Sequence, residues 1–176
     1  LNALGVRYYK VRKGLGFNKT AQQYGAFPSD PYSHTPAHSG AQQPGMTGQV
    51  KEEVITRFGE LGIRIRAGAL HIDPRLLLAS EFIHNSRTFK TTLLDGNVAN
   101  FELKSGELAF TYCQTPFIYI VDSNTGHIRV QINRQDGSQQ VSEGSQLPAD
   151  AYQDVIQRTG HIRCVRITVP ERLLFQ

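Results

Sequence analysis

The sequence lacks any apolar run close to the roughly 20 residues that a membrane-spanning helix needs, and its first residues lack the pattern of a secretory signal. We therefore expect no membrane among its partners, and the sequence shows no targeting signal that would indicate a compartment. Cysteine is scarce as well. Cys113 and Cys164 form no CxxC pair, are too few for a disulfide framework and have apolar neighbours, which predicts buried free thiols.

The excess of charge of either sign is also small, because 19 Lys and Arg residues stand against 15 Asp and Glu residues, for a net charge of +4. The basic residues are scattered, and the one dense cluster, at 8–13, belongs to no recognisable module that reads nucleic acid. We interpret it as a solvated segment and expect no nucleic-acid partner. The length of 176 residues and the apolar content of 39% fit one globular domain with an appendage and exclude collagenous, coiled-coil and fully disordered chains.

A segment rich in proline, glycine and polar residues runs from Leu15 to Thr47. Its four prolines prevent a lasting helix or central strand, which predicts a long loop. Tyrosine and phenylalanine are interleaved with serine, histidine and glutamine, and this mixture is typical of sugar binding. Planar polar groups bind hydroxyls, and aromatic rings stack on sugar faces. The alternative is a structural loop whose polar groups satisfy its own backbone.

Other chemistries fit this region less well. The stretch 14–20 lacks the glycine that a phosphate-binding loop has directly before its Lys-Thr pair. Asp30, His34 and His38 have the spacing of metal ligands on a helix, but two prolines in the same stretch oppose that helix. A serine triad would need a nucleophile elbow, which is missing. We therefore assign no metal, no cofactor and no catalytic residue, while calcium at an Asp-rich turn stays open.

The periodicity of the sequence changes after this loop. Between Thr47 and Gly59, Val50, Val54, Ile55 and Phe58 recur on one face, which predicts an amphipathic helix with a buried stripe. From Ile63 onward the period is two, and turn signals separate short predicted strands. A short helix is expected at 148–158. The predicted strands are 63–66, 70–72, 82–83, 88–94, 98–103, 108–113, 117–121, 127–132 and 161–169.

Short strands with frequent turns are typical of an antiparallel sandwich or barrel. The predicted fold is mainly β, with an antiparallel β-sandwich at 61–176 preceded by the long Pro/Gly-rich loop and one helix at 1–60. The helix and loop cannot bury enough apolar surface by themselves, so they must dock on the β domain or on further chain. We expect this sequence to be a piece of a longer polypeptide that continues beyond both of its ends.

Several segments resemble a known family. Residues 44–54 (PGMTGQVKEEV), followed by 58–63 (FGELGI) and 68–74 (GALHIDP), resemble a junction in six-hairpin glycoside hydrolases and phosphorylases. In those enzymes the last helix of a helical toroid runs into a C-terminal β-sandwich at this junction. Residues 103–116 (LKSGELAFTYCQTP) resemble a strand pair of that sandwich. The stretch 24–43 is similar to a segment of uncharacterised bacterial proteins of this type.

The resemblance implies that this chain is the C-terminal part of a carbohydrate-active enzyme, with 1–60 as the end of an upstream helical domain of the same polypeptide. The catalytic carboxylates would lie in that upstream toroid, outside this chain. The loop before the last toroid helix lies near the substrate funnel, so the resemblance implies carbohydrate contacts from this loop. The residues are Asp30, Tyr32, His34, His38, Gln42 and Gln43. The alternative is a noncatalytic β-sandwich module for glycan binding or assembly.

Overall fold

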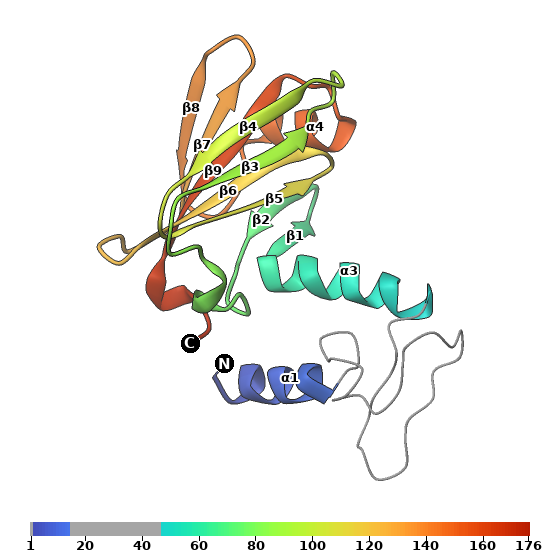
Figure 1. The fold of residues 1–176 in the computed structure, drawn as a ribbon. Helices are drawn as coiled ribbons and strands as arrows, with labels where there is room; N and C mark the ends of the chain where they lie inside the picture. Colours follow the sequence, from blue (N-terminus) through green and yellow to red (C-terminus); the bar gives the residue numbers. More distant parts are fainter. Residues whose placement is uncertain (1, 15–46) are drawn as a thin grey trace. The chain divides into compact units, whose positions relative to one another are not determined.

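The computed structural model describes residues 2–14 and 47–176 (Figure 1). Contacts divide the chain into two compact units, Leu1–Phe58 and Gly59–Gln176. The first unit holds helix α1 (Asn2–Gly14) and most of helix α3 (Thr47–Leu61). The second unit, here called the β domain, holds every strand of the described residues. The basic cluster at 8–13 lies within α1, a helix that the sequence pattern did not specify.

The β domain is built on a five-stranded sheet in the order β5-β6-β9-β7-β8. Its strands are β5 (Glu107–Tyr112), β6 (Thr115–Asp122), β7 (Arg129–Arg134), β8 (Gln139–Glu143) and β9 (Ile162–Pro170). The prediction of a mainly β fold is confirmed, but the wholly antiparallel pairing is wrong. Strands β6 and β9 run parallel, because the chain forms the β7–β8 hairpin and a helix before it returns beside β6.

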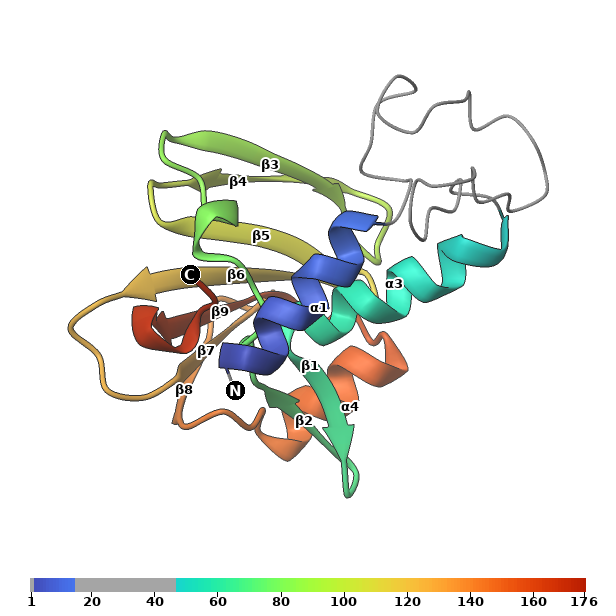
Figure 2. The ribbon, with the colours of Figure 1, turned by 90° about the horizontal axis from the view of Figure 1, so that it is seen from below.

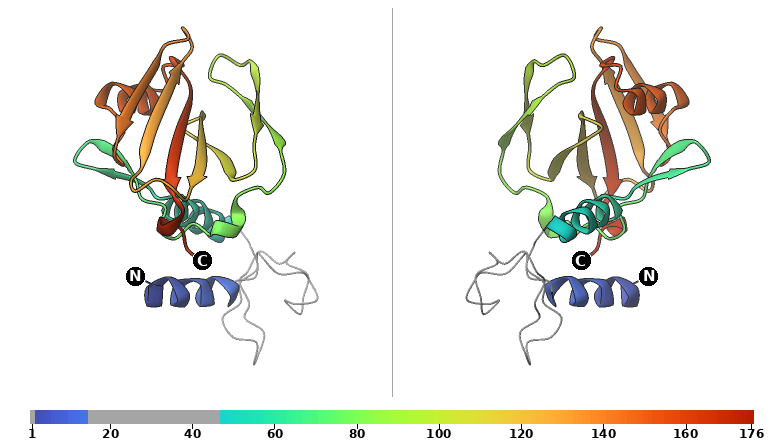
Figure 3. Two further views of the ribbon diagram at one scale, coloured as in Figure 1. Left: turned by 90° about the vertical axis from the view of Figure 1, so that its left-hand side faces the viewer. Right: turned by 90° about the vertical axis from the view of Figure 1, so that its right-hand side faces the viewer.

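Smaller elements cover the two faces of this sheet (Figures 2 and 3). One face carries the antiparallel hairpin of β3 (Arg87–Thr92) and β4 (Val98–Leu103). The other face carries helix α4 (Ala149–Gln157) and the hairpin of β1 (Ile63–Arg66) and β2 (Ala69–Ile72). The β domain therefore has three layers, with the five-stranded sheet in the middle.

The core follows from the alternation of side chains along the central strands. On β6, Ile118 packs with Phe101 and Leu103 of β4, beneath the β3–β4 hairpin. Phe117 and Tyr119 point to the opposite face, and both are fully buried. Strand β6, an interior strand of the sheet, is thus apolar on both sides, which explains why 117–121 is a nearly continuous apolar run.

Most predicted elements occur close to the predicted positions, including α4. One predicted strand is absent, and one strand was not predicted. Residues 82–83 form no strand and instead follow a short 3-10 helix, Ala79–Glu81. Strand β8 was missed because it is an edge strand whose single apolar residue, Val141, is exposed, so the sequence carries no apolar alternation there.

The buried stripe predicted for α3 is wrong at two of its residues. The exposed fractions of Val54 and Ile55 are 48% and 71%, and Phe58 is only half-buried. The last turn is different, because Glu60 and Leu61 are buried and the Tyr119 hydroxyl donates a 2.5 Å hydrogen bond to the Leu61 carbonyl. A helix buries an apolar face only where a second surface packs against it. In the described part of α3 only the last turn has such a surface, which includes Tyr119 of β6.

The two thiols are free, as predicted. Cys164 is buried in the core, and burial raises the pKa of its thiol. Cys113 is only half-buried, although burial raises the pKa of its thiol too. The reason is its place in the tight β5–β6 turn, where Cys113 and Gln114 both have positive φ, of 49° and 64°.

Candidate functional site

A polar cleft of about 320 Å³ lies on the sheet face that carries the β3–β4 hairpin. Its floor comes from Asn133 on β7, Gln139 on β8, and Cys164 and Arg166 on β9. Phe101 of β4 forms an apolar part of the lining. We call this site the amide cleft, after its two amide side chains.

The strand register explains why these side chains gather in one place. Asn133 lies opposite Cys164 on β9 and opposite Gln139 on β8, and residues directly opposite each other share a face of the sheet. Val130 and Ile132 alternate with the polar residues of β7 and are fully buried on the other face. The polar face of β7 is therefore a consequence of its period-two pattern.

Hydrogen bonds hold the cleft side chains in place. Gln131 Nε2 donates to Asn133 Oδ1 at 3.0 Å and to Gln139 Oε1 at 3.4 Å. Asn133 Nδ2 in turn donates to Cys164 Sγ at 3.4 Å. An amide NH₂ group has two donors, so Asn133 and Gln139 keep N–H groups that can reach a ligand.

Arg166 is held by a buried carboxylate. Its Nη2 lies 2.7 Å from Oε1 of Glu107, whose side chain is only 5% exposed. A guanidinium has five donors in a planar fork, so this ion pair leaves further N–H groups at the cleft. Together with the amides, Arg166 gives the cleft planar donors and acceptors at fixed positions.

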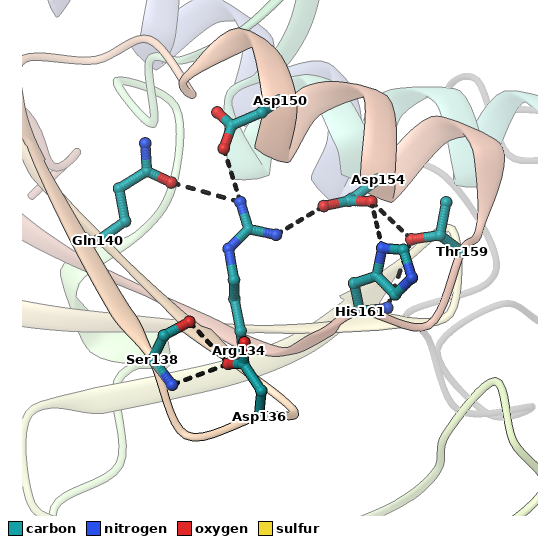
Figure 4. A network of polar contacts seen from close by, with 8 residues as sticks. All are labelled: Arg134, Asp136, Ser138, Gln140, Asp150, Asp154, Thr159 and His161. Atoms are coloured by element: carbon teal, nitrogen blue, oxygen red, sulfur yellow. Dashed lines mark hydrogen bonds and ion pairs between the residues drawn. The ribbon is translucent and has the colours of Figure 1, made fainter.

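A second polar cluster joins the end of β7 to α4 (Figure 4), and its central residue, Arg134, also belongs to the lining of the amide cleft. Arg134 follows Asn133 on β7 and points toward the helix, and the register of β7 and β9 shifts between these two residues. Arg134 Nη1 lies 2.7 Å from Asp154 Oδ2, and its Nη2 lies 2.6 Å from Asp150 Oδ2. The hydrogen bond with Asp154 raises the pKa of Arg134, and burial opposes it. This guanidinium therefore joins β7 to two successive turns of α4.

The other oxygen of Asp154 accepts two further hydrogen bonds. Thr159 Oγ1 donates to Oδ1 at 2.7 Å, and His161 Nδ1 lies 3.0 Å from the same atom. Burial by itself would raise the pKa of Asp154, but the hydrogen bonds from Thr159, Arg134 and His161 outweigh it, so the pKa is lowered.

An aspartate, a histidine and a hydroxyl in one cluster invite comparison with a hydrolase triad. In a triad the histidine lies between the carboxylate and the nucleophile. Here Thr159 and His161 both bind the same carboxylate oxygen, so no histidine activates the hydroxyl. The cluster has the geometry of a structural anchor for α4.

The cleft extends to the β7–β8 turn, where Gly137 and Ser138 belong to its lining. Asp136 orders this turn by accepting hydrogen bonds from the hydroxyl of Ser138, at 2.6 Å, and from its backbone N–H, at 2.9 Å. The same two bonds lower the pKa of Asp136. The Asp136-Gly137 pair thus lies in the turn between β7 and β8.

The substrate contacts implied by the resemblance, which are Asp30, Tyr32, His34, His38, Gln42 and Gln43, all lie outside the described residues. Their contact with carbohydrate therefore stays a prediction. The sequence reasoning missed the amide cleft. A signal was present, because Gln131 and Asn133 alternate with Val130 and Ile132, but the pattern does not tell which strands bring further polar residues beside them.

Within residues 2–14 and 47–176, no group of three or more His, Cys, Asp and Glu residues lies together in a way that could hold a metal ion. No helix in this part of the chain is both long enough and apolar enough to cross a membrane. The chain matches no protein-family model and no curated protein. Its function is therefore argued from the residues and their geometry.

Proposed function

We propose that this chain is the C-terminal part of a carbohydrate-active enzyme of the glycoside hydrolase or phosphorylase type. In this proposal the β domain supports an upstream helical domain, and the catalytic carboxylates belong to that domain. The loop residues Asp30, Tyr32, His34, His38, Gln42 and Gln43 contact the carbohydrate substrate. The proposal rests on the resemblance at the helix-to-strand junction and on one feature of α3.

The feature is the contrast between the two parts of α3. Its last residue, Leu61, is 3% exposed and accepts the hydrogen bond from Tyr119 in the β domain. One to two turns earlier, Val54 and Ile55 present apolar side chains to solvent. An apolar face beside an anchored end is what the last helix of a helical domain presents to its neighbouring helices.

The test compares Ile55→Asp in the 176-residue chain and in the longer polypeptide encoded by the same gene. In the 176-residue chain we expect the free energy of unfolding to change by less than about 0.5 kcal/mol, because the side chain is exposed. In the longer polypeptide we expect a loss of about 3 kcal/mol, because the charge would enter a helix–helix contact. Urea denaturation measures both.

Ile65→Asp is the matched control, since Ile65 is a half-exposed isoleucine on β1 of the β domain. Its cost should be the same in both proteins, because the β domain is common to both. The proposal fails if Ile55→Asp costs equally little in both, or if the coding sequence upstream of this chain contains no repeated helical hairpins.

The amide cleft favours a second candidate function, a noncatalytic module that binds glycans. Sugar hydroxyls pair well with planar groups that both donate and accept, and the amides of Asn133 and Gln139 are such groups. Arg166 adds further donors in the same cleft. The buried apolar core of the β domain is consistent with a binding module, because it packs against the strands that carry the cleft residues.

This candidate predicts that Gln139→Ala weakens oligosaccharide binding about 5- to 100-fold, the range for a lost hydrogen bond to a polar ligand group. The melting temperature should hardly change, because Gln139 is exposed on an edge strand. Gln146→Ala, an exposed glutamine outside the cleft lining, is the control. A glycan array identifies a ligand, and titration calorimetry then measures its Kd for the wild type and both variants. Absence of binding to a broad panel of glycans would contradict this candidate function.

A further inference from the structure

A second groove in the β domain, of about 430 Å³, has three arginines and two histidines among its lining residues. It lies beside the β1–β2 hairpin and is completed by residues of the loops before β7 and after β8. We call it the arginine groove. The residues that define it are Arg64, Arg66, His71, Asp73, Arg75 and His127.

The hairpin register places the basic side chains together. Arg64 lies directly opposite His71, and Arg66 follows two residues after Arg64 on the same face of β1. The alternate residues Leu70 and Ile72 are 0% and 1% exposed, because the other face of the hairpin packs into the core. The period-two pattern thus separates an apolar face from a cationic one.

The arginine groove carries more positive charge than its own residues neutralise. Asp73 is the only carboxylate among its lining residues, all of which are described, against three guanidinium groups. Arg75 Nε is 2.8 Å from Asp73 Oδ1, whereas Arg64 Nη1 is 3.7 Å from Oδ2. The sixth defining residue, His127, pairs with Glu143, which is not part of the lining.

Arg66 has neither an ion pair nor a side-chain hydrogen bond within the part of the chain that the structure describes. Its guanidinium therefore keeps all its donors. Because Arg64 makes only a long contact with Asp73, most of its donors are also left for a ligand.

The backbone around the groove is fixed by hydrogen bonds to the core. Ile72 N–H donates to the Ser145 carbonyl at 2.7 Å, and Leu147 N–H donates to the Leu70 carbonyl at 2.9 Å. Asp73 N–H donates to the Gly62 carbonyl at 2.8 Å. The strands that carry the arginines are therefore held in place before any ligand binds, which lowers the entropy cost of binding.

We propose that the arginine groove binds the phosphate or sulfate group of a small molecule. Guanidinium forks donate paired hydrogen bonds to tetrahedral oxyanions, and an excess of positive charge in a preformed groove attracts them. The volume is within the range of small-molecule sites and has room for a sugar-sized body beside the anion. This proposal does not depend on the proposed function.

The experiment is titration calorimetry on the full 176-residue chain with inorganic phosphate, inorganic sulfate, glucose 6-phosphate and, as the neutral reference, glucose. We expect the oxyanion ligands to bind and glucose not to bind. Arg66→Gln should raise the Kd for the anions about tenfold, which corresponds to about 1.4 kcal/mol for one lost charge-assisted contact. Because Arg66 has no partner in the described structure, the variant should keep the wild-type melting temperature.

Arg87→Gln, an exposed arginine on β3, removes the same charge away from the groove and should change the Kd less than twofold. Tighter binding of glucose 6-phosphate than of inorganic phosphate assigns the groove to a phosphorylated sugar, and equal affinity assigns it to the free anion. Both results support the proposal. Absence of binding at millimolar concentration, or equal weakening by Arg66→Gln and Arg87→Gln, overturns it.

Discussion

Replacing Gly62 by alanine is expected to lower the free energy of unfolding of the β domain by about 2–5 kcal/mol. Gly62 connects α3 to β1 with φ of +74°, a left-handed conformation that costs an L residue about 1–2 kcal/mol. A Cβ atom at this position would lie 2.2 Å from the backbone carbonyl carbon of Asp73. Backbone cannot rotate aside as a flexible side chain does, so overpacking adds about 1–3 kcal/mol.

Gly68→Ala is the matched control for this prediction. Gly68 has nearly the same φ, +72°, but a Cβ there would meet no atom within 4 Å. It should therefore show the conformational cost alone, about 1–2 kcal/mol. Urea denaturation of both variants separates the two contributions, and equal losses would show that the contact between Gly62 and Asp73 is not tight.

Replacing Asp154 by asparagine is expected to cost about 2–3 kcal/mol at pH 7. The side chain of Asp154 is 15% exposed and accepts hydrogen bonds from Arg134, Thr159 and His161. Asparagine removes the negative charge and leaves the Arg134 guanidinium, which is 20% exposed, with the exposed Asp150 as its remaining ion-pair partner and a 3.4 Å hydrogen bond to Gln140. Hydrogen bonds to charged groups contribute about 1.5–3 kcal/mol, and leaving the partly buried Arg134 charge less well paired adds to the loss.

The pH dependence of this effect follows from the lowered pKa of Asp154. Its pKa is lower in the folded protein than the ordinary value of about 3.9 in the unfolded chain. The stabilisation is therefore fully present above that ordinary value and is lost as the pH falls through the folded pKa. The difference between the wild type and Asp154→Asn should shrink below about pH 4.

Asp150→Asn serves as the control, because its carboxylate binds the same guanidinium but is 56% exposed. Solvent screening limits its expected cost to less than about 1 kcal/mol. Unfolding curves from pH 7 to pH 2.5 test both variants. A larger loss for Asp150→Asn, or a difference for Asp154→Asn that does not change with pH, would contradict the assignment of Asp154 as the anchor of α4.

The strand positions could be predicted because alternation is a local property of the chain. The pattern of Ile63 to Arg66 states which side chains share a face before any partner strand is known. The same reasoning failed where the pattern was absent, at β8, and where burial needs a second surface, at Val54 and Ile55 of α3. An amphipathic stripe predicts that a face is apolar, and it does not supply the element that covers the face.

The period-two pattern was enough to predict a mainly β protein after α3, with a short helix before its last strand. It did not determine that β9 returns parallel to β6 or that Asn133 and Arg166 line one cleft. Nor could it place His127 beside the β1–β2 hairpin, more than 50 residues away in the chain. Local patterns specify which side chains of one strand share a face. Only the order in which strands pair brings the faces of distant strands together, and the amide cleft and the arginine groove both result from that pairing.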